Sequence, residues 1–552
     1  MRLRRPRSVR EDGVAGLVLG VQSVPDGLAT GLLAGVNPLA GLYAYMVGTI
    51  AGALVTSSAF MVVQGTGAMA IIIADVPAVQ GAEGERALFM LAVLTGVVMV
   101  GAGLLRLGSM LRFVSNAVMV GFINAVGVNI VLGQLGNLTG YAADGPNRVV
   151  RAADTILSPA QLDWTSVTIG LGTIAGVLLL ERARAGGLGL VVAVVAASAA
   201  AYLLDLSSVA TLDDLGVAVD GLPTPALPAL GELPVLIIPA LSLAFVALIQ
   251  GAAISANFVN PDGRYPDASR DFVGQGVANI ASGFLRGMPV GGSLSASSLS
   301  REAGARSRLA PLIAGLVMLL TIALLGDVIG KVAMPALAGL LILIGVRTVK
   351  PADLVSVWRT GIVQKTVLVV TFVLTMLIPL QYAVLVGVGL SVVLHVVRQS
   401  NTVTIRRRVY EDGHVVETDP PSELPSAEVV VLQPYGSLFF AAAPVFEAAL
   451  PAVGRHSRNT VVILRLRGRS DLGTTFMDVL RRYALSLAEV GSRLVIVSAS
   501  ERIQEQLAVT GVTAVIGADA IHPGDERVGA TLRRAYDDAE RWVAARVAED
   551  DR

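Results

Sequence analysis

The sequence predicts a polytopic α-helical membrane protein of about fourteen transmembrane segments, followed by a smaller α/β domain. Of the 552 residues, 54% are hydrophobic and only 15% are charged, whereas soluble proteins carry roughly 25% charged residues. Mean hydropathy is +0.69, and apolar runs follow one another with short breaks up to residue 400. A chain so poor in charge is neither a soluble monomer nor disordered, so we expect it to span a membrane.

The apolar segments can be placed in chain order. Most are long enough to cross ~30 Å of hydrocarbon. The third and tenth are short and rich in glycine, serine and threonine, and the ninth is weakly hydrophobic. The approximate spans are 13–33, 38–57, 62–75, 87–106, 112–135, 165–181, 188–205, 233–256, 269–284, 291–301, 308–326, 330–346, 365–380 and 382–398.

Arginine placement predicts the orientation, because cytoplasmic loops carry the excess of basic residues. The 206–232 loop contains no lysine or arginine, which places it outside. An even number of spans then brings both termini to the cytoplasmic side of a bacterial plasma membrane. Five arginines at the N-terminus support this: Arg2, Arg4, Arg5, Arg7 and Arg10.

The change in composition near residue 400 helps to divide the chain into four parts. Residues 1–12 are expected to be a cytoplasmic N-terminus, 13–400 the membrane domain, 401–426 a linker and 427–552 a cytoplasmic domain. In the last part strands and helices alternate, which predicts an α/β sandwich. Its expected strands are 428–432, 437–440, 460–466 and 493–498, and its expected helices 444–453, 473–489, 501–509 and 526–547.

Several classes of function are excluded. A formal net charge of zero argues against nucleic-acid binding. The chain has no cysteine, and its four histidines show no metal-ligand spacing. No nucleophile–base pair or phosphate-binding loop stands out, so we expect neither an enzyme nor a bound cofactor or metal.

The two short segments occupy the same position in two seven-segment halves. Paired short segments interrupted by glycine are the best sequence pointer to a transporter site. Half-helices that begin at the membrane midplane leave N–H groups unpaired and carry a positive dipole end, which suits an anion. Close packing of small residues between helices is the alternative interpretation. The candidate binding residues are Gln64, Gly65, Thr66, Gly67, Ala68, Gly292, Ser293, Leu294, Ser295 and Ala296.

The motifs resemble those of the sulfate permease (SulP) family of anion transporters, relatives of prestin and pendrin. Val24-Pro25-Asp26-Gly27-Leu28-Ala29 resembles the first-helix signature of that family. Gly292-Ser293-Leu294-Ser295 and Glu302-Ala303-Gly304-Ala305-Arg306 resemble the tenth helix and the loop after it. The C-terminal domain resembles a STAS domain.

The resemblance implies a fold of seven plus seven inverted repeats, with a core domain (helices one to four and eight to eleven) and a gate domain. The substrate would lie between the third and tenth helices, and the core would move against the gate like an elevator. The implied activity is secondary transport, by symport or exchange, of sulfate, bicarbonate, chloride or a small carboxylate. We also expect a homodimer in the lipid bilayer and a coupling ion, either a proton or sodium.

Three residues depart from the family pattern. Asp26 replaces a common glutamine after Pro25, Ala296 replaces a common arginine, and Gln250 lies nearest to the acidic residue that several bacterial members carry in the eighth helix. Because an ionisable residue inside a membrane is by default a functional hypothesis, we expect Asp26 to bind a proton as the anion loads. Alternatively, Asp26 lies in a water-filled vestibule or caps a helix break at Pro25.

Two other functions remain open at this point. The missing arginine at Ala296 is compatible with a neutral solute such as a nucleobase. The second alternative is a membrane sensor or scaffold that signals through its STAS domain. Related domains carry a phosphorylatable serine after an aspartate; here Asp471 matches, but Leu472 occupies the serine position, so regulation by phosphorylation is not expected.

Overall fold

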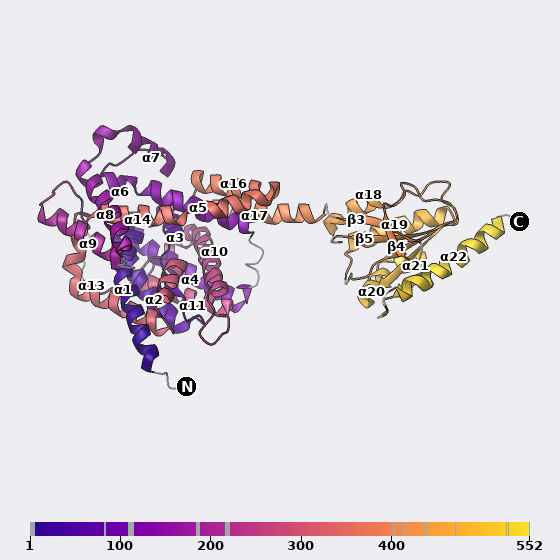
Figure 1. The fold of residues 1–552 in the computed structure, drawn as a ribbon, viewed down its shortest axis with the longest axis horizontal. Helices are drawn as coiled ribbons and strands as arrows, with labels where there is room; N and C mark the ends of the chain where they lie inside the picture. The colour runs from indigo at the N-terminus through magenta and orange to yellow at the C-terminus, as the bar shows by residue number, and fades with distance from the viewer. Residues whose placement is uncertain are drawn as a thin grey trace. The chain divides into compact units, whose positions relative to one another are not determined.

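The structure is a computed structural model. It describes residues 6–81, 84–108, 115–183, 188–215, 221–400, 403–411, 414–436, 438, 440–469, 471–525, 527 and 529–550. Arg2, Arg4 and Arg5, on which the predicted orientation partly depends, lie outside these residues. The chain divides into two compact units, Met1–Ser391 and Val392–Arg552 (Figure 1).

Each of the fourteen predicted apolar segments contains a helix. Seven of the helices in the described residues are long and apolar enough to cross a membrane unaided. Two are much shorter, with 8 residues in α3 and 9 in α12, as predicted for the third and tenth segments. The helices are α1 (Pro6–Leu33), α2 (Pro38–Val55), α3 (Gly67–Ala74), α4 (Glu85–Leu104), α5 (Asn116–Gly133), α8 (Trp164–Arg182), α9 (Leu188–Leu203), α10 (Leu233–Asn257), α11 (Ala268–Phe284), α12 (Leu294–Glu302), α13 (Leu309–Gly330), α14 (Met334–Thr348), α16 (Ile362–Leu377) and α17 (Leu380–Ser400).

Three connecting helices were not predicted: α6 (Leu135–Thr139), α7 (Arg148–Leu157) and α15 (Pro351–Thr360). Each is too short to cross a membrane, so a search for long apolar runs misses it. The side chain of Asn147 caps the first turn of α7 by accepting from Val150 N at 2.9 Å. A capping asparagine and a mixed apolar and charged pattern were therefore the available signals.

The helices form two groups. In the first, α11 packs along α4 and α2, and α1 packs along α13 and α2. In the second, α5 packs against α14 and α16, and α8 packs against α9 and α14. The first group contains segments from both halves of the chain, as inverted repeats require.

Hydrogen bonds define two opposite faces of this unit. On one, which we call the N-terminal face, Asp12 at the start of α1 accepts from Arg306 N and Ser307 N at 2.6 and 2.9 Å, ahead of α13. On the other, the opposite face, Ala226 N donates to Phe284 O at the end of α11 at 2.9 Å. Successive long helices run alternately between the two faces.

The second unit is a six-stranded sheet with helices on both sides (Figure 1). The strand order is β4-β3-β5-β6-β7-β8, with parallel pairing from β5 to β8 and antiparallel pairing among β3, β4 and β5. Its elements are β3 (Thr404–Glu411), β4 (His414–Thr418), β5 (Val429–Tyr435), β6 (Val461–Arg465), β7 (Arg493–Ala499), β8 (Ile521–Pro523), α18 (Ala443–Ala449), α19 (Thr474–Glu489), α20 (Glu501–Val509), α21 (Val512–Ile516) and α22 (Ala530–Asp550).

Alternating side chains of the central strands build two cores. Val430, Leu432 and Leu464 face the core that α18, α19 and α20 cover, whereas Val431 and Ile463 face α22. This period of two is the expected pattern for a sheet covered on both faces.

Part of this unit differs from the sequence expectation. Strands β3 and β4 lie inside residues 401–426, where a linker was predicted. The sequence did not indicate β3 because three consecutive arginines interrupt its strand pattern. Of the predicted strand 437–440, residues 437 and 439 lie outside the described residues, and Phe440 begins a 3-10 turn.

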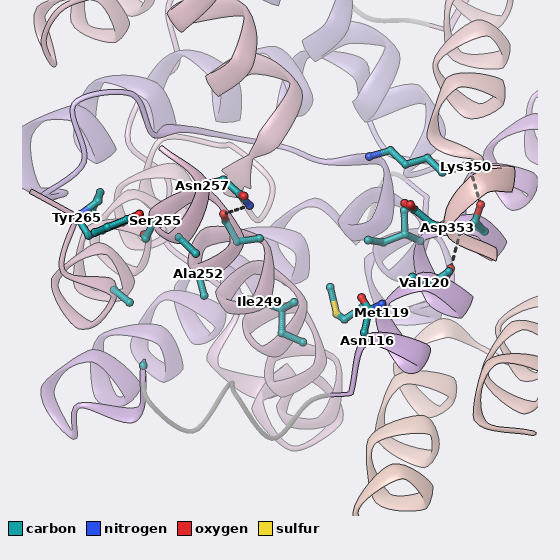
Figure 2. A pocket seen from close by; sticks show the side chains of 17 residues that line it. Asn116, Met119, Val120, Ile249, Ala252, Ser255, Asn257, Tyr265, Lys350 and Asp353 are labelled. Carbon is teal, nitrogen blue, oxygen red and sulfur yellow. Dashed lines mark hydrogen bonds between the residues drawn. The ribbon is translucent and has the colours of Figure 1, made fainter. Parts of the chain in front are cut away.

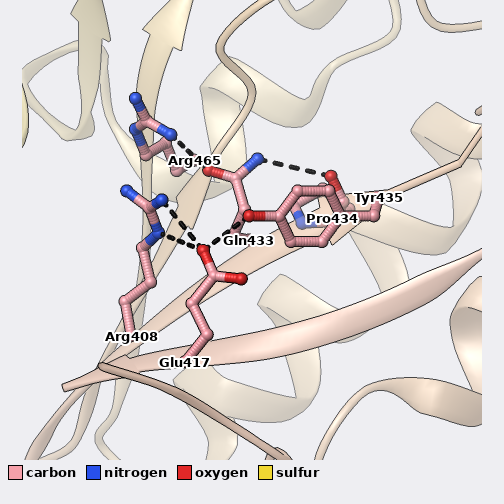
Figure 3. A network of polar contacts seen from close by, with 6 residues as sticks. All are labelled: Arg408, Glu417, Gln433, Pro434, Tyr435 and Arg465. Atoms are coloured by element: carbon pink, nitrogen blue, oxygen red, sulfur yellow. Dashed lines mark hydrogen bonds and ion pairs between the residues drawn. The ribbon is translucent and has the colours of Figure 1, made fainter. Parts of the chain in front are cut away.

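A polar network ties β3, β4 and β5 together (Figure 3). The Glu417 carboxylate accepts from Tyr435 OH at 2.5 Å and from Arg408 Nε and Nη2 at 3.1 and 2.9 Å. The Tyr435 hydrogen bond, together with Arg408, holds the pKa of Glu417 below its ordinary value. Beside it, Arg465 Nη1 donates to Gln433 Oε1 at 2.5 Å.

Candidate functional site

The third and tenth segments pair directly with each other. Each begins with a short strand, β1 (Val62–Gln64) and β2 (Gly291–Ser293). The strands are antiparallel, with Val62 opposite Ser293, Val63 opposite Gly292 and Gln64 opposite Gly291. Residues more than two hundred positions apart thus form one two-stranded ribbon inside the helical unit.

The antiparallel pairing sets the direction of the two half-helices. Because α3 follows β1 and α12 follows β2, the two helices leave the ribbon in opposite directions, with both N-termini at the ribbon. Thr66 caps α3 by accepting from Met69 N at 3.4 Å, and Ser293 caps α12 by accepting from Ala296 N at 3.3 Å. The first N–H groups of a helix have no partner inside it, so each end offers donors and a partial positive charge.

The edges of the ribbon are held by side chains that were not predicted. Gln275 Oε1 accepts from Gly292 N at 2.8 Å. Asn279 exchanges two hydrogen bonds with the backbone of Val290, at 2.8 and 2.6 Å. Gln275 and Asn279 are fully buried and one turn apart on α11, which explains the weak hydrophobicity of the ninth predicted segment. The polar residues of the ninth segment were visible in the sequence, but the ribbon backbone that they bind was not identifiable from it.

On the β1 side, Ser297 Oγ accepts from Val62 N at 3.0 Å. Ser297 lies on α12, so the tenth segment helps to satisfy the strand of the third. Backbone N–H groups of the ribbon therefore have side-chain acceptors at Val62, Val290 and Gly292. The polar groups that remain exposed are at the two helix ends.

The candidate residues of the third segment have different environments. Thr66 is half-buried, and its Oγ1 donates to Gln250 Oε1 at 3.2 Å, so Gln250 of α10 lies beside the start of α3. Gln64, by contrast, is 2% exposed and donates to Ser23 Oγ at 2.8 Å. Gln64 therefore anchors the ribbon to α1, whereas Thr66 remains open. Gly65 and Ala68 are buried and Gly67 is half-buried.

In the third segment the N-cap residue Thr66 is partly exposed, whereas in the tenth segment exposure begins one residue after the N-cap Ser293. Gly292 and Ser293 are buried, Leu294 and Ser295 are exposed, and Ala296 is half-buried. The hydroxyls of Ser293 and Ser295 lie 3.2 Å apart. The first turn of α12 thus presents the Ser295 hydroxyl and the adjacent N–H groups.

Two glycines permit close packing at the ribbon. A Cβ on Gly65 would lie 2.5 Å from Met288 Cε and 3.0 Å from the Tyr45 ring. A Cβ on Gly292 would lie 3.0 Å from the Cα of Gly251 on α10. At Gly292 the obstacle is backbone, so the backbone of α10 would have to give by a few tenths of an ångström to accept a side chain there.

Asp26 lies on the face of α1 that follows the ribbon. Ser23, one turn before it, receives the Gln64 hydrogen bond, and Thr30, one turn after it, lies next to Gly65. Thr30 Oγ1 donates to the backbone carbonyl of Asp26 at 2.6 Å and lies 2.9 Å from Tyr45 OH.

The carboxyl of Asp26 is incompletely satisfied. The residue is half-buried, Gln22 is its side-chain hydrogen-bond partner, and its buried Oδ1 has no hydrogen-bond partner among the described residues. Pro25 lies inside α1, which continues to Leu33. The structure shows no helix break at Pro25 for Asp26 to cap, and the vestibule alternative stays open.

Two cavities flank this region. The first has a volume of about 1000 Å³ and lies between α10, α5 and the start of α15, toward the N-terminal face. Figure 2 shows Asn116, Asn257 and Lys350 around it, with Ile249, the neighbour of Gln250, on its wall. The second has a volume of about 670 Å³ and lies toward the opposite face, among α1, α5, α6 and α7.

Comparison with family models assigns both units. Residues 9–371 match the model of the sulfate permease family. Residues 424–533 match the model of the STAS domain.

Individual relatives are consistent with this. "Putative sulfate transporter YbaR" of Bacillus subtilis is 27% identical over 398 residues, covering 71% of this chain and 78% of that protein. "Probable sulfate transporter Rv1739c" of Mycobacterium tuberculosis is 30% identical over 57% of this chain and 58% of that protein. "Bicarbonate transporter BicA" of Picosynechococcus is 26% identical over 72% and 71%.

A solved structure shares the fold of the whole chain. The structure of SLC26A9 superposes with a TM-score of 0.83 at 19% identity and covers 98% of this chain and 92% of that one. The fold of seven plus seven inverted repeats with a STAS domain is thereby confirmed. The family that the model describes is one of transporters rather than enzymes, as expected. With its family model matched over residues 9–371, this chain belongs to the sulfate permease family of multi-pass membrane proteins.

Proposed function

We propose that the chain is a secondary transporter, a symporter or exchanger, of small anions such as sulfate, bicarbonate, chloride or carboxylates. The observation that carries this proposal is the pair of half-helices whose N-termini meet at the β1–β2 ribbon. Their open first turns present N–H groups together with the hydroxyls of Thr66 and Ser295. Relatives named as a putative sulfate transporter and a bicarbonate transporter support the same class of substrate.

The charge at the site favours a small anion without a fixed cation. Each helix end contributes roughly half a positive charge, so two ends together offset about one negative charge. Ala296 adds none. A monovalent anion, or a divalent anion accompanied by a proton, therefore matches the charge of the proposed site.

We propose Asp26 as the group that binds the coupling ion. Two other acids within the helical unit are saturated: Asp12 accepts from two backbone N–H groups and Ser307 Oγ, and Asp271 accepts from Ser57 and Ser255. Only Asp26 among these three keeps a buried oxygen without a partner. A proton on that oxygen would remove an uncompensated buried charge, and sodium is the alternative occupant.

We further propose elevator-type movement of a core group (α1–α4 and α10–α13) against a gate group formed by α5, α8, α9, α14, α16 and α17. Support comes from the packing of the helices into these two groups. Both cavities lie between residues of the two groups. Closure of one cavity as the other opens would expose the half-helix ends alternately.

The orientation and assembly are also proposals. The N-terminal face gathers Arg306, Arg308 and Arg270, so we place it in the cytoplasm of a bacterial cell. Residues 1–12 and the STAS domain would lie on that side, and the chain would act as a homodimer. We propose a membrane domain from residue 13 to about residue 400 and place the start of the second domain before Thr404 rather than at 427, because β3 and β4 belong to its sheet.

The test is counterflow in proteoliposomes with labelled sulfate, bicarbonate and succinate at two pH values. We expect at least one anion to exchange and the others to compete according to affinity. Thr66→Val should weaken this exchange several-fold, because it removes the half-exposed hydroxyl that caps α3 and donates to Gln250. Thr321→Val is the matched control, since Thr321 bonds only within α13, to Val317 O at 2.9 Å.

Two outcomes would overturn the proposal. If no anion competes but uracil does, the neutral-solute function, with which the missing fixed cation at Ala296 is compatible, replaces it. If no solute moves in a preparation that retains its fold, a sensor or scaffold acting through the STAS domain is the better description.

A further inference from the structure

The cavity on the opposite face is lined by two cations and no acid. Arg148 and Arg151, one turn apart on α7, both contribute to its wall, as do the amides of Gln80 and Gln134. None of the described residues that line it is acidic. The cavity on the N-terminal face differs, because Lys350 is accompanied there by Asp353.

Arg148 connects this cavity to the binding half-helix. Its Nη2 lies 2.8 Å from Asp75 Oδ1 and 3.4 Å from Ile71 O. Asp75 is the C-cap of α3, and both side chains are largely buried, at 14% and 17% exposure. The far end of α3 is therefore bound to α7, and its 8 residues separate the cavity from Thr66 by about 12 Å.

Arg151 differs from Arg148. It is exposed, and it forms no ion pair within the described part of the chain. The cavity therefore contains one guanidinium that a carboxylate already neutralises and a neighbouring one that is open to a ligand.

We propose that Arg148 and Arg151 form an anion-recruitment site in this cavity, where the entering anion replaces Asp75 as the partner of Arg148. The proposal rests on the proposed function, because it supplies the approach of the same anion to the half-helices. Guanidinium groups bind carboxylate and oxyanions through paired N–H donors. Because α7 packs against α5 and α16 of the gate group, exchange of Asp75 for the anion would also release α3 of the core from that group, which the proposed movement of the core requires.

The first test compares KM and kcat for uptake into cells, where added anion meets the opposite face under the proposed orientation. Arg151→Gln should raise KM by at least about threefold with little change in kcat, and the effect should shrink as ionic strength rises. Lys331→Gln is the matched control. It removes one exposed cation from the same face, beside Tyr202 rather than in the cavity.

Asp75→Asn separates recruitment from a purely structural role. If Asp75 competes with the anion, its neutralisation should lower KM, whereas Arg148→Gln should raise it. If the Arg148–Asp75 ion pair is purely structural, both substitutions should change KM in the same direction. Equal increases in KM for the two variants, or an Arg151→Gln protein indistinguishable from Lys331→Gln, would overturn the proposal.

A second measurement does not need transport. Because the chain has no cysteine, Ala142→Cys places a single thiol on the cavity wall. A positive cavity should make an anionic thiosulfonate react faster than a neutral one, and Arg151→Gln should reduce that ratio. An unchanged ratio refutes the recruitment site even if transport is confirmed, and a reduced ratio supports it even if the transported solute proves to be different.

Discussion

The hydroxyls of Thr66 and Ser293, from the two halves of the chain, each accept a hydrogen bond from the backbone N–H three residues later, at 3.4 and 3.3 Å. Both residues adjoin the same antiparallel ribbon. The two halves therefore present equivalent helix ends to a common centre.

Neutralising Asp26 should separate coupling from binding. Asp26→Asn keeps the shape of the side chain but cannot take up a proton, so pH-driven uptake should be abolished while anion counterflow remains. The measurement is uptake into proteoliposomes with and without an imposed pH gradient. Asp327→Asn, an exposed change at the end of α13, is the control. Unchanged pH dependence in Asp26→Asn would assign coupling to another group.

Introducing a cation at the site should alter selectivity. Ala296→Arg places a positive charge in the first turn of α12, so divalent sulfate should gain affinity relative to monovalent bicarbonate. Competition counterflow at fixed pH measures the ratio, and Ala296→Gln controls for side-chain size. A change that is equal for both anions would argue against electrostatic selection at this position.

Close packing at the ribbon should make Gly292→Ala costly. Its new Cβ would lie 3.0 Å from the Cα of Gly251, and backbone moves less readily than a side chain. We expect a loss of about 1–3 kcal/mol, typical of overpacking, seen as a lower unfolding temperature in detergent. Gly172→Ala on α8 is the control, because no atom lies within 4 Å of its added Cβ. Equal unfolding temperatures for the two variants would contradict the close contact.

Removing the Gln275 side-chain oxygen should destabilise the ribbon. Gln275→Leu leaves the buried Gly292 N–H without its acceptor, which costs about 1–3 kcal/mol. Faster hydrogen exchange at Gly292 and its neighbours is the direct readout. Gln364→Leu near the start of α16 provides a half-buried control. Wild-type exchange in Gln275→Leu would mean that the N–H has another partner.

The STAS sheet should lose stability in acid through Glu417. Its folded-state pKa lies below the ordinary value, chiefly because Tyr435 OH donates to its carboxylate. The stabilisation is therefore fully present above the ordinary glutamate pKa, roughly 4.3, and is lost as pH falls through the lower folded-state value.

Hydrogen exchange of β3 and β4 in the full chain, corrected for intrinsic rates, should show this loss, and Glu417→Gln should reduce it. Glu505→Gln is a suitable control, because it neutralises an exposed carboxylate on α20, outside the Glu417 network. If acid weakens β3 and β4 equally in wild type and Glu417→Gln, another group is responsible.

Much of the fold was predictable because transmembrane segments are identified by local composition. The sequence directly indicated the arginines of the N-terminal face and the short third and tenth segments. Every predicted span contains a helix. Helices α7 and α15 were missed because a ten-residue amphipathic helix lacks a long apolar run. Strand β3 was missed because Arg406, Arg407 and Arg408 interrupt its pattern.

For the site, the sequence by itself determined which short polar segments matter, since glycine and hydroxyl residues interrupt the apolar pattern there. Only the tertiary structure decided that Val63 pairs with Gly292, that Gln64 is a buried anchor while Thr66 is open, and that Arg148 reaches Asp75. The physical reason is that these relationships join residues from distant parts of the chain. A side chain's periodicity reveals its helix or strand, but its hydrogen-bond partner depends on how those elements pack.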